Sequence, residues 1–141
     1  MFSPAPAFAS FRPQHMANAY RNVGVETGVV GASAHRLVAM LYEGFMDAVA
    51  TARGALREGR IEAKGRAIGH AARIVEEGLK AGLNLKDGGK LATDLDAIYR
   101  YVGLRLTHAN LHNDEAALDE CVRLITPLAD AWKAIGVRMP A

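Results

Sequence analysis

The chain lacks most of the features that would assign it a chemical activity or a membrane location. Its one cysteine, Cys121, excludes an intramolecular disulfide bond, and the apolar residues around it indicate a buried, inert thiol. No uninterrupted apolar run is long enough to span a bilayer. Pro4, Pro6 and Pro13 interrupt any apolar core that a signal peptide would need. We therefore expect a protein of the reducing cytoplasm that does not insert into a membrane.

An excess of charge of one sign is also missing. The chain carries 17 Lys and Arg against 15 Asp and Glu, a formal net charge of +2, and the two signs are interleaved along it. A nucleic-acid-binding domain usually gathers its cations on one face. The charge pattern therefore indicates a mixed, solvated surface and argues against a nucleic-acid partner.

Catalytic and cofactor motifs are scarce as well. The sequence contains no GxxxxGK[ST] loop, GxGxxG fingerprint, CxxC pair or GxSxG elbow. His108 and His112 have the i, i+4 spacing of two zinc ligands, but the glutamate of HExxH is absent and no third ligand is placed. A metal-dependent helical-bundle enzyme using this pair is the alternative interpretation. Two solvated histidines near a helix C-terminus are the simpler one, so we predict no enzyme, no cofactor and no metal site.

What the chain does contain is helical periodicity. Apolar residues recur at the 3.6-residue period, with polar residues opposite, in four segments: residues 33–59, 60–83, 90–112 and 113–135. Ser33 is the expected N-cap of the first helix, Gly59 its expected stop, and Pro127 is expected to bend the last helix. Because the connecting segments are short, neighbouring helices should run antiparallel. The sequence thus predicts an all-α, antiparallel up-down four-helix bundle.

The ends of the chain do not share this period. Residues 1–14 are expected to form a Pro-containing extension, residues 15–22 a short helix, and the Gly-containing residues that follow a linker. The predicted organisation is therefore a flexible extension, cap segment and linker over residues 1–32. The bundle follows over residues 33–136, and a tail over residues 137–141.

The helices also carry more apolar positions than one closed core requires. On the third helix, a line opposite the main apolar stripe consists of Ala97, Tyr101, Leu104 and Leu111. On the first helix, the residues expected to pack the core include Leu37, Leu41, Ala48 and Ala52. Its flank is expected to line a groove through Val38, Tyr42, Phe45 and Val49. Such lines favour grooves that bind partner helices, and a broader core is the other interpretation.

Several stretches, taken in order, resemble one known family. They are AYRNVGVET at 19–27, SAHRLVAMLYEGFMDAVATAR at 33–53, GRIEAKGRAIGHAARIVEEGLKAGLN at 59–84, GGKLATDLDAIYRYV and LTHANLHND across 88–114, and DAWK at 130–133. Together they cover residues 16 to about 135 and are similar to FliS, the flagellin-specific chaperone family of the bacterial flagellar export system. The chain departs from the family pattern at Ala34, where a proline is usual, and at Pro127.

The resemblance implies a helical bundle that binds the disordered C-terminal segment of flagellin in the cytoplasm. Binding would prevent premature polymerisation and deliver flagellin to the type III export gate. The resemblance also implies that the N-terminal segment, through Tyr20, covers part of the groove and docks to the export membrane protein FlhA. The residues expected to form the groove and its cap are Tyr20, Val23, Val25, Val38, Tyr42, Phe45, Val49, Ala97, Tyr101, Leu104 and Leu111. Pairing of two copies through bare grooves, as a homodimer without client, stays open.

Overall fold

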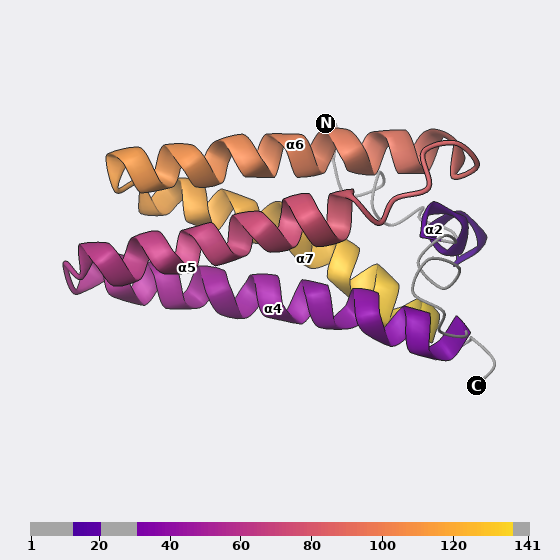
Figure 1. The fold of residues 1–141 in the computed structure, drawn as a ribbon, viewed down its shortest axis with the longest axis horizontal. Helices are drawn as coiled ribbons and strands as arrows, with labels where there is room; N and C mark the ends of the chain where they lie inside the picture. Colours follow the sequence, from indigo (N-terminus) through magenta and orange to yellow (C-terminus); the bar gives the residue numbers. More distant parts are fainter. Residues whose placement is uncertain (1–12, 21–30, 137–141) are drawn as a thin grey trace, which may run out of the picture.

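The computed structural model of the chain describes residues 13–20 and 31–136. They form a short helix, α2 (Pro13–Ala19), and four long helical segments: α4 (Gly31–Arg57), α5 (Ile61–Arg73) with its continuation η1 (Ile74–Lys80), α6 (Gly89–His112) and α7 (Glu115–Gly136). The long segments lie side by side in alternating directions (Figure 1). The predicted antiparallel four-helix bundle with a short N-terminal helix is therefore confirmed.

Local signals in the sequence set most of the helix ends. Gly59, in the turn after α4, has a φ of 72°, which glycine adopts without strain. Asn113 ends α6 with a φ of 51°, and the carboxylate of Asp114 then accepts from the amide of Ala117 at 3.3 Å. The beginnings of α2, α4 and α7 each differ by two residues from the prediction, α7 starting at Glu115 rather than at residue 113. Helix α4 starts at Gly31 rather than at residue 33, and α2 includes Pro13, because the first helical position needs no amide donor.

The second long helix changes form where an uninterrupted α-helix is predicted. From Ile74 to Lys80 its turns widen into the π-helix η1. Gly78 lies within η1 against α4, where a Cβ atom would be only 2.8 Å from Cδ2 of Leu41. The glycine therefore permits a close approach between η1 and α4.

The core corrects the predicted inward face of α4. Leu37 is 37% exposed and Leu41 is only partly buried, whereas Val38, Phe45 and Val49 are buried almost completely. Ala48 and Ala52 are buried, as the sequence predicts. The buried face of α4 is rotated relative to the predicted one. The reason is that α4 packs against α5, η1 and α7, so its buried face points between these neighbours. In the part of the chain that the structure describes, no helix has the length and apolar character needed to cross a membrane.

Candidate functional site

The short helix α2 covers the end of the bundle where α4 and α6 begin (Figure 1). Its residues Met16 and Ala19, with Tyr20 directly after it, are buried in the core. The amide of Asn84 donates to the carbonyl oxygen of Ala19 at 2.7 Å. A Cβ atom at Gly88 would overlap the carbonyl oxygen of Asn84 and the Cβ of Ala92 and would lie 3.2 Å from Cα of Ala19, so glycine fits in the narrow space between these neighbours and α2. Helix α2 and Tyr20 thus pack closely on this end of the bundle, and we call residues 13–20 the α2 cap.

Three tyrosine hydroxyl groups meet under the α2 cap. The hydroxyl of Tyr20 donates to the carbonyl oxygen of Leu79 at 2.9 Å. The hydroxyl of Tyr99 lies 2.7 Å from that of Tyr20 and 2.7 Å from that of Tyr42. Because each hydroxyl has one proton and Tyr20 gives its own to Leu79, Tyr99 donates to Tyr20 and Tyr42 donates to Tyr99. This tyrosine chain links the α2 cap to α4, η1 and α6.

Burial keeps the tyrosine chain neutral. It raises the pKa of Tyr42 to about 12. Burial also raises the pKa values of Tyr20 and Tyr99 well above the usual range. Both neighbouring tyrosines reinforce this effect at Tyr99, whereas at Tyr20 the contact with Tyr42 reinforces it and the hydrogen bond with Tyr99 opposes it. A phenolate would lose water and gain no cation at this position. The three phenols therefore stay protonated at any physiological pH.

Two further aromatic residues extend the cluster to α7. The Trp132 ring meets the Tyr20 ring edge to face at 5.4 Å and stacks on the His35 ring at 4.8 Å. The indole nitrogen of Trp132 donates to the carbonyl oxygen of His35 at 2.9 Å, and Nε2 of His35 lies 2.7 Å from the carbonyl oxygen of Trp132. Since a carbonyl oxygen only accepts, Nε2 of His35 carries a proton. These contacts fix the start of α4 against the end of α7.

An open groove of about 580 Å³ runs between α4 and α7 next to this cluster. Its apolar lining comes from Ala39, Tyr42, Met46 and Ala129, and its charged lining from Arg36, Glu43, Asp47, Asp130 and Lys133. A second hollow of about 500 Å³, between α4 and α5, is lined partly by small residues such as Gly44, Ala48, Ala63 and Ala67. Both are open enough to admit side chains of a partner.

The longest exposed apolar line lies on α6. Tyr101, Leu104 and Leu111 are 43%, 70% and 73% exposed, Ala97 is exposed, and His108 lies between the two leucines along the line. We call Ala97, Tyr101, Leu104, His108 and Leu111 the α6 ridge. Isolated exposed apolar side chains are ordinary, but large ones aligned on one helix face are typical of an interaction surface.

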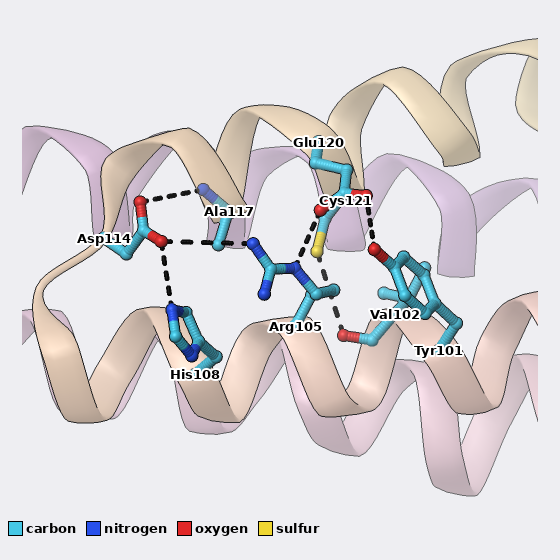
Figure 2. A network of polar contacts seen from close by, with 8 residues as sticks. All are labelled: Tyr101, Val102, Arg105, His108, Asp114, Ala117, Glu120 and Cys121. Atoms are coloured by element: carbon cyan, nitrogen blue, oxygen red, sulfur yellow. Dashed lines mark hydrogen bonds and ion pairs between the residues drawn. The ribbon is translucent and has the colours of Figure 1, made fainter.

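Polar contacts fix the α6 ridge against α7, as Figure 2 shows. The carboxylate of Glu120 accepts from the hydroxyl of Tyr101 at 2.5 Å and from Nε of Arg105 at 2.7 Å. The hydrogen bond from Tyr101 and the pairing with Arg105 lower the pKa of Glu120. Asp114 accepts from Nε2 of His108 at 3.1 Å. The Tyr101 ring is therefore held in place although it is exposed.

The structure divides the predicted site residues into separate groups. Tyr20 and Tyr42 meet in the tyrosine chain, and the buried core takes Val38, Phe45 and Val49. The exposed α6 ridge takes Ala97, Tyr101, Leu104 and Leu111. Val23 and Val25 lie outside the described residues.

Sequence reasoning missed other members of the cluster under the α2 cap. Tyr99 is the centre of the tyrosine chain, and Trp132 and His35 bridge α4 and α7. Tyr99 and Trp132 lie on or beside apolar stripes, so periodicity alone predicts packing for them and gives no sign of their polar contacts. The rings of His108 and His112 are 4.6 Å apart, and the described residues hold no group of three side chains that could bind a metal.

Comparisons with known proteins agree with this architecture. A family model described as the flagellar protein FliS matches residues 16–139. The flagellar secretion chaperone FliS of Salmonella typhimurium is 44% identical over 117 residues, which cover 83% of this chain and 87% of the relative. The chaperone of the same name from Escherichia coli is 37% identical over 82% of this chain and 85% of the relative. That of Bacillus subtilis is 30% identical over 85% of each.

Proposed function

The chain belongs to the FliS family of flagellar proteins, and on this premise we propose that it binds the C-terminal segment of flagellin in the cytoplasm. Its relatives at 30–44% identity are named flagellar secretion chaperones, so the chain is an export chaperone and not an enzyme. In this role it keeps flagellin from polymerising early and delivers it to the type III export gate. No finding supports the metal-dependent alternative at His108 and His112.

The exposed α6 ridge is the observation that best supports client binding. A segment that is disordered alone loses conformational entropy when it folds on a partner, so a large apolar surface must compensate. The α6 ridge supplies such a surface without any rearrangement. The groove between α4 and α7 supplies a second surface on another side of the bundle. A client segment that wraps around the bundle would use both.

The α2 cap supplies a third surface when it moves aside. A helix of 7 residues is too short to be stable alone, so α2 depends on its contacts with the bundle. Its departure would open the aromatic cluster around Tyr42, Tyr99 and Trp132. Val38, Phe45 and Val49 lie on the same face of α4 as Tyr42. In this proposal they line the client groove only after the α2 cap has left.

The displaced cap also offers a link to export. The resemblance implies that Tyr20 takes part in docking to FlhA, and in this structure Tyr20 is buried. Tyr20 would then become available to FlhA only after the client has replaced the cap, and Val23 and Val25, which follow it in the sequence, stay predicted members of the cap segment. Without a client, pairing of two copies through the same apolar surfaces would compete with client binding.

Titration calorimetry with a synthetic peptide of the flagellin C-terminal segment tests the function. We expect one-to-one binding with a strongly negative heat-capacity change, the sign of a large buried apolar area. Leu104→Asp should weaken binding with little change in the melting temperature, because this side chain is exposed. Absence of binding to the wild-type protein would contradict the proposal. A stoichiometric bound metal that is lost in His108→Ala would instead support the alternative.

A further inference from the structure

The second long helix ends at its contact with the α2 cap (Figure 1). An α-helix would pair the carbonyl oxygen of Leu79 with the amide of Leu83, and a π-helix such as η1 would pair it with the amide of Asn84. In this structure the amide of Leu83 donates to the carbonyl oxygen of Lys80 at 3.2 Å. The amide of Asn84 donates to the carbonyl oxygen of Ala19, in the α2 cap, at 2.7 Å. The helix therefore stops because both amides that could continue it are engaged elsewhere.

The α2 cap takes the place of these amides. The hydroxyl of Tyr20 donates to the carbonyl oxygen of Leu79 at 2.9 Å, while the preceding residue, Ala19, accepts from Asn84. A carbonyl group at the C-terminus of a helix needs a donor from outside the helix, and Tyr20 supplies it. Because Leu79 and Asn84 are five residues apart, they are also the pair that would close one more π-helical turn. The α2 cap thus terminates the second helix as well as covering the aromatic cluster.

Helical hydrogen bonds are present on both sides of this interruption. Before it, the amide of Gly82 donates to the carbonyl oxygen of Gly78 at 3.0 Å. After it, the amide of Gly88 donates to the carbonyl oxygen of Asn84 at 2.7 Å, again across four residues. The chain is therefore already wound as a helix before and after the contact with the cap. A hydrogen bond from Asn84 to Leu79 would join the two parts.

We propose that the second long helix is extended toward α6 when the α2 cap leaves, with the amide of Asn84 bonded to Leu79 in place of Ala19. The inference goes beyond the proposed function, because it concerns the free protein and needs no client. Leu85 and Lys86, in the turn that follows, are exposed. The capped and uncapped forms therefore present different surfaces in this turn, and a protein that contacts it would distinguish them.

A full-length variant whose cap cannot dock tests the proposal. Met16→Asp combined with Tyr20→Asp places two carboxylates at buried positions of the α2 cap, which expels the cap from the bundle. NMR spectra should then show Cα resonances of residues 81–84 shifted toward helical values, and the amide of Asn84 should stay protected from hydrogen exchange. Scalar couplings across the hydrogen bond identify its acceptor, which should be Ala19 in the wild-type protein and Leu79 in the variant.

Two further variants complete the test. Leu104→Asp combined with Leu111→Asp adds the same charge at exposed positions of α6, so this matched control should leave the signals of residues 81–84 unchanged. Tyr20→Phe removes only the hydroxyl that donates to Leu79 and weakens the hold of the cap. The Cα resonances of residues 81–84 should move in the same direction as in the double variant, by a smaller amount, because the cap leaves more often.

Rapid exchange of the Asn84 amide in the double variant, with Cα resonances of residues 81–84 at random-coil values, would mean that the helix end unravels. That result would overturn the proposal, and so would unchanged signals. If the double variant does not fold, Tyr20→Phe decides, and unchanged resonances over residues 81–84 in that variant would overturn the proposal. Flagellin binding enters none of these measurements, so the proposed function stands or fails separately.

Discussion

Buried polar side chains make the most specific contacts at the scale of single residues, and Lys64 is the clearest case. It is 3% exposed, and its Nζ donates to the carbonyl oxygen of Asn110 at 2.9 Å and to Oδ1 of Asn113 at 2.5 Å. Asn113 is the left-handed residue that ends α6. The ammonium group of α5 therefore satisfies acceptors at the C-terminus of α6, where the helix dipole also favours a cation.

Lys64→Met removes these donors and keeps an apolar side chain of similar length. We expect it to lower the free energy of unfolding by about 1–3 kcal/mol, because two part-buried hydrogen bonds from a charged donor to the end of α6 are lost. Urea denaturation measures this change. Lys86→Met, at an exposed position between η1 and α6, is the control and should change stability by less than about 0.5 kcal/mol. Equal stability of the two variants would show that Lys64 does not stabilise α6.

The tyrosine chain predicts a loss of stability at alkaline pH. The folded protein keeps the phenol protons of Tyr20, Tyr42 and Tyr99, because burial raises the three pKa values, that of Tyr42 to about 12. The unfolded chain releases these protons near the ordinary value of about 10. The stability they contribute is therefore complete below pH ~10 and is lost as the pH rises toward the folded-state pKa.

Urea midpoints between neutral pH and pH ~11 measure this loss. The decline should be shallower in Tyr20→Phe, which has one fewer buried phenol, although this variant is less stable at neutral pH. If tyrosinate absorbance appears at the ordinary pKa for all four tyrosines while the helical circular dichroism is unchanged, the chain of hydroxyl contacts is wrong.

At the scale of helices, periodicity predicts where each element lies better than how it is oriented. The apolar arc of α4 includes both Leu37 and Val38, and the sequence analysis expected Leu37 in the core and Val38 on its flank. The neighbours of α4 decide that Val38 is buried and Leu37 is exposed. No local pattern in the sequence predicts the π-helix η1 either. Gly78 lies within it, and the need for a glycine there becomes clear only from its contact with Leu41. The α6 ridge, in contrast, could be predicted, because its residues lie opposite the core stripe of α6.

Alanine substitutions at two glycines of the second long helix should change the stability of the protein in opposite directions. At Gly65 a Cβ atom would come no closer than 4.0 Å to its neighbour, Oδ1 of Asn110, so Gly65→Ala should stabilise the protein by about 0.5–1 kcal/mol. At Gly78 a Cβ atom would overlap Leu41, so Gly78→Ala should destabilise it by about 1–2 kcal/mol. Thermal and urea denaturation compare the two variants. A gain of stability in Gly78→Ala would mean that η1 and α4 are less closely packed than the structure shows.

At the scale of the whole molecule, the apolar surface falls into three parts that differ in what covers them. Most of the core is buried between the long helices, the cluster around Tyr99 is covered by the α2 cap, and the α6 ridge is open. The cap is held by the buried side chains of Met16, Ala19 and Tyr20, by the hydroxyl contacts of Tyr20 with Leu79 and Tyr99, and by the backbone contact of Ala19 with Asn84. The surface under the α2 cap is therefore the part of the apolar surface that a client could cover in place of the cap.

Removal of residues 1–21 tests this exchange. The truncated protein should keep the helical circular dichroism of the bundle, because α4 to α7 pack against one another without α2. It should melt at a lower temperature, since Tyr42, Tyr99 and Trp132 lose the apolar cover and hydroxyl contact of the cap. Stopped-flow mixing with the flagellin C-terminal peptide should show faster association, because no cap has to leave first. Leu104→Asp in the full chain should instead weaken affinity and leave the melting temperature nearly unchanged. If truncation changes neither the association rate nor the affinity, the α2 cap does not compete with the client.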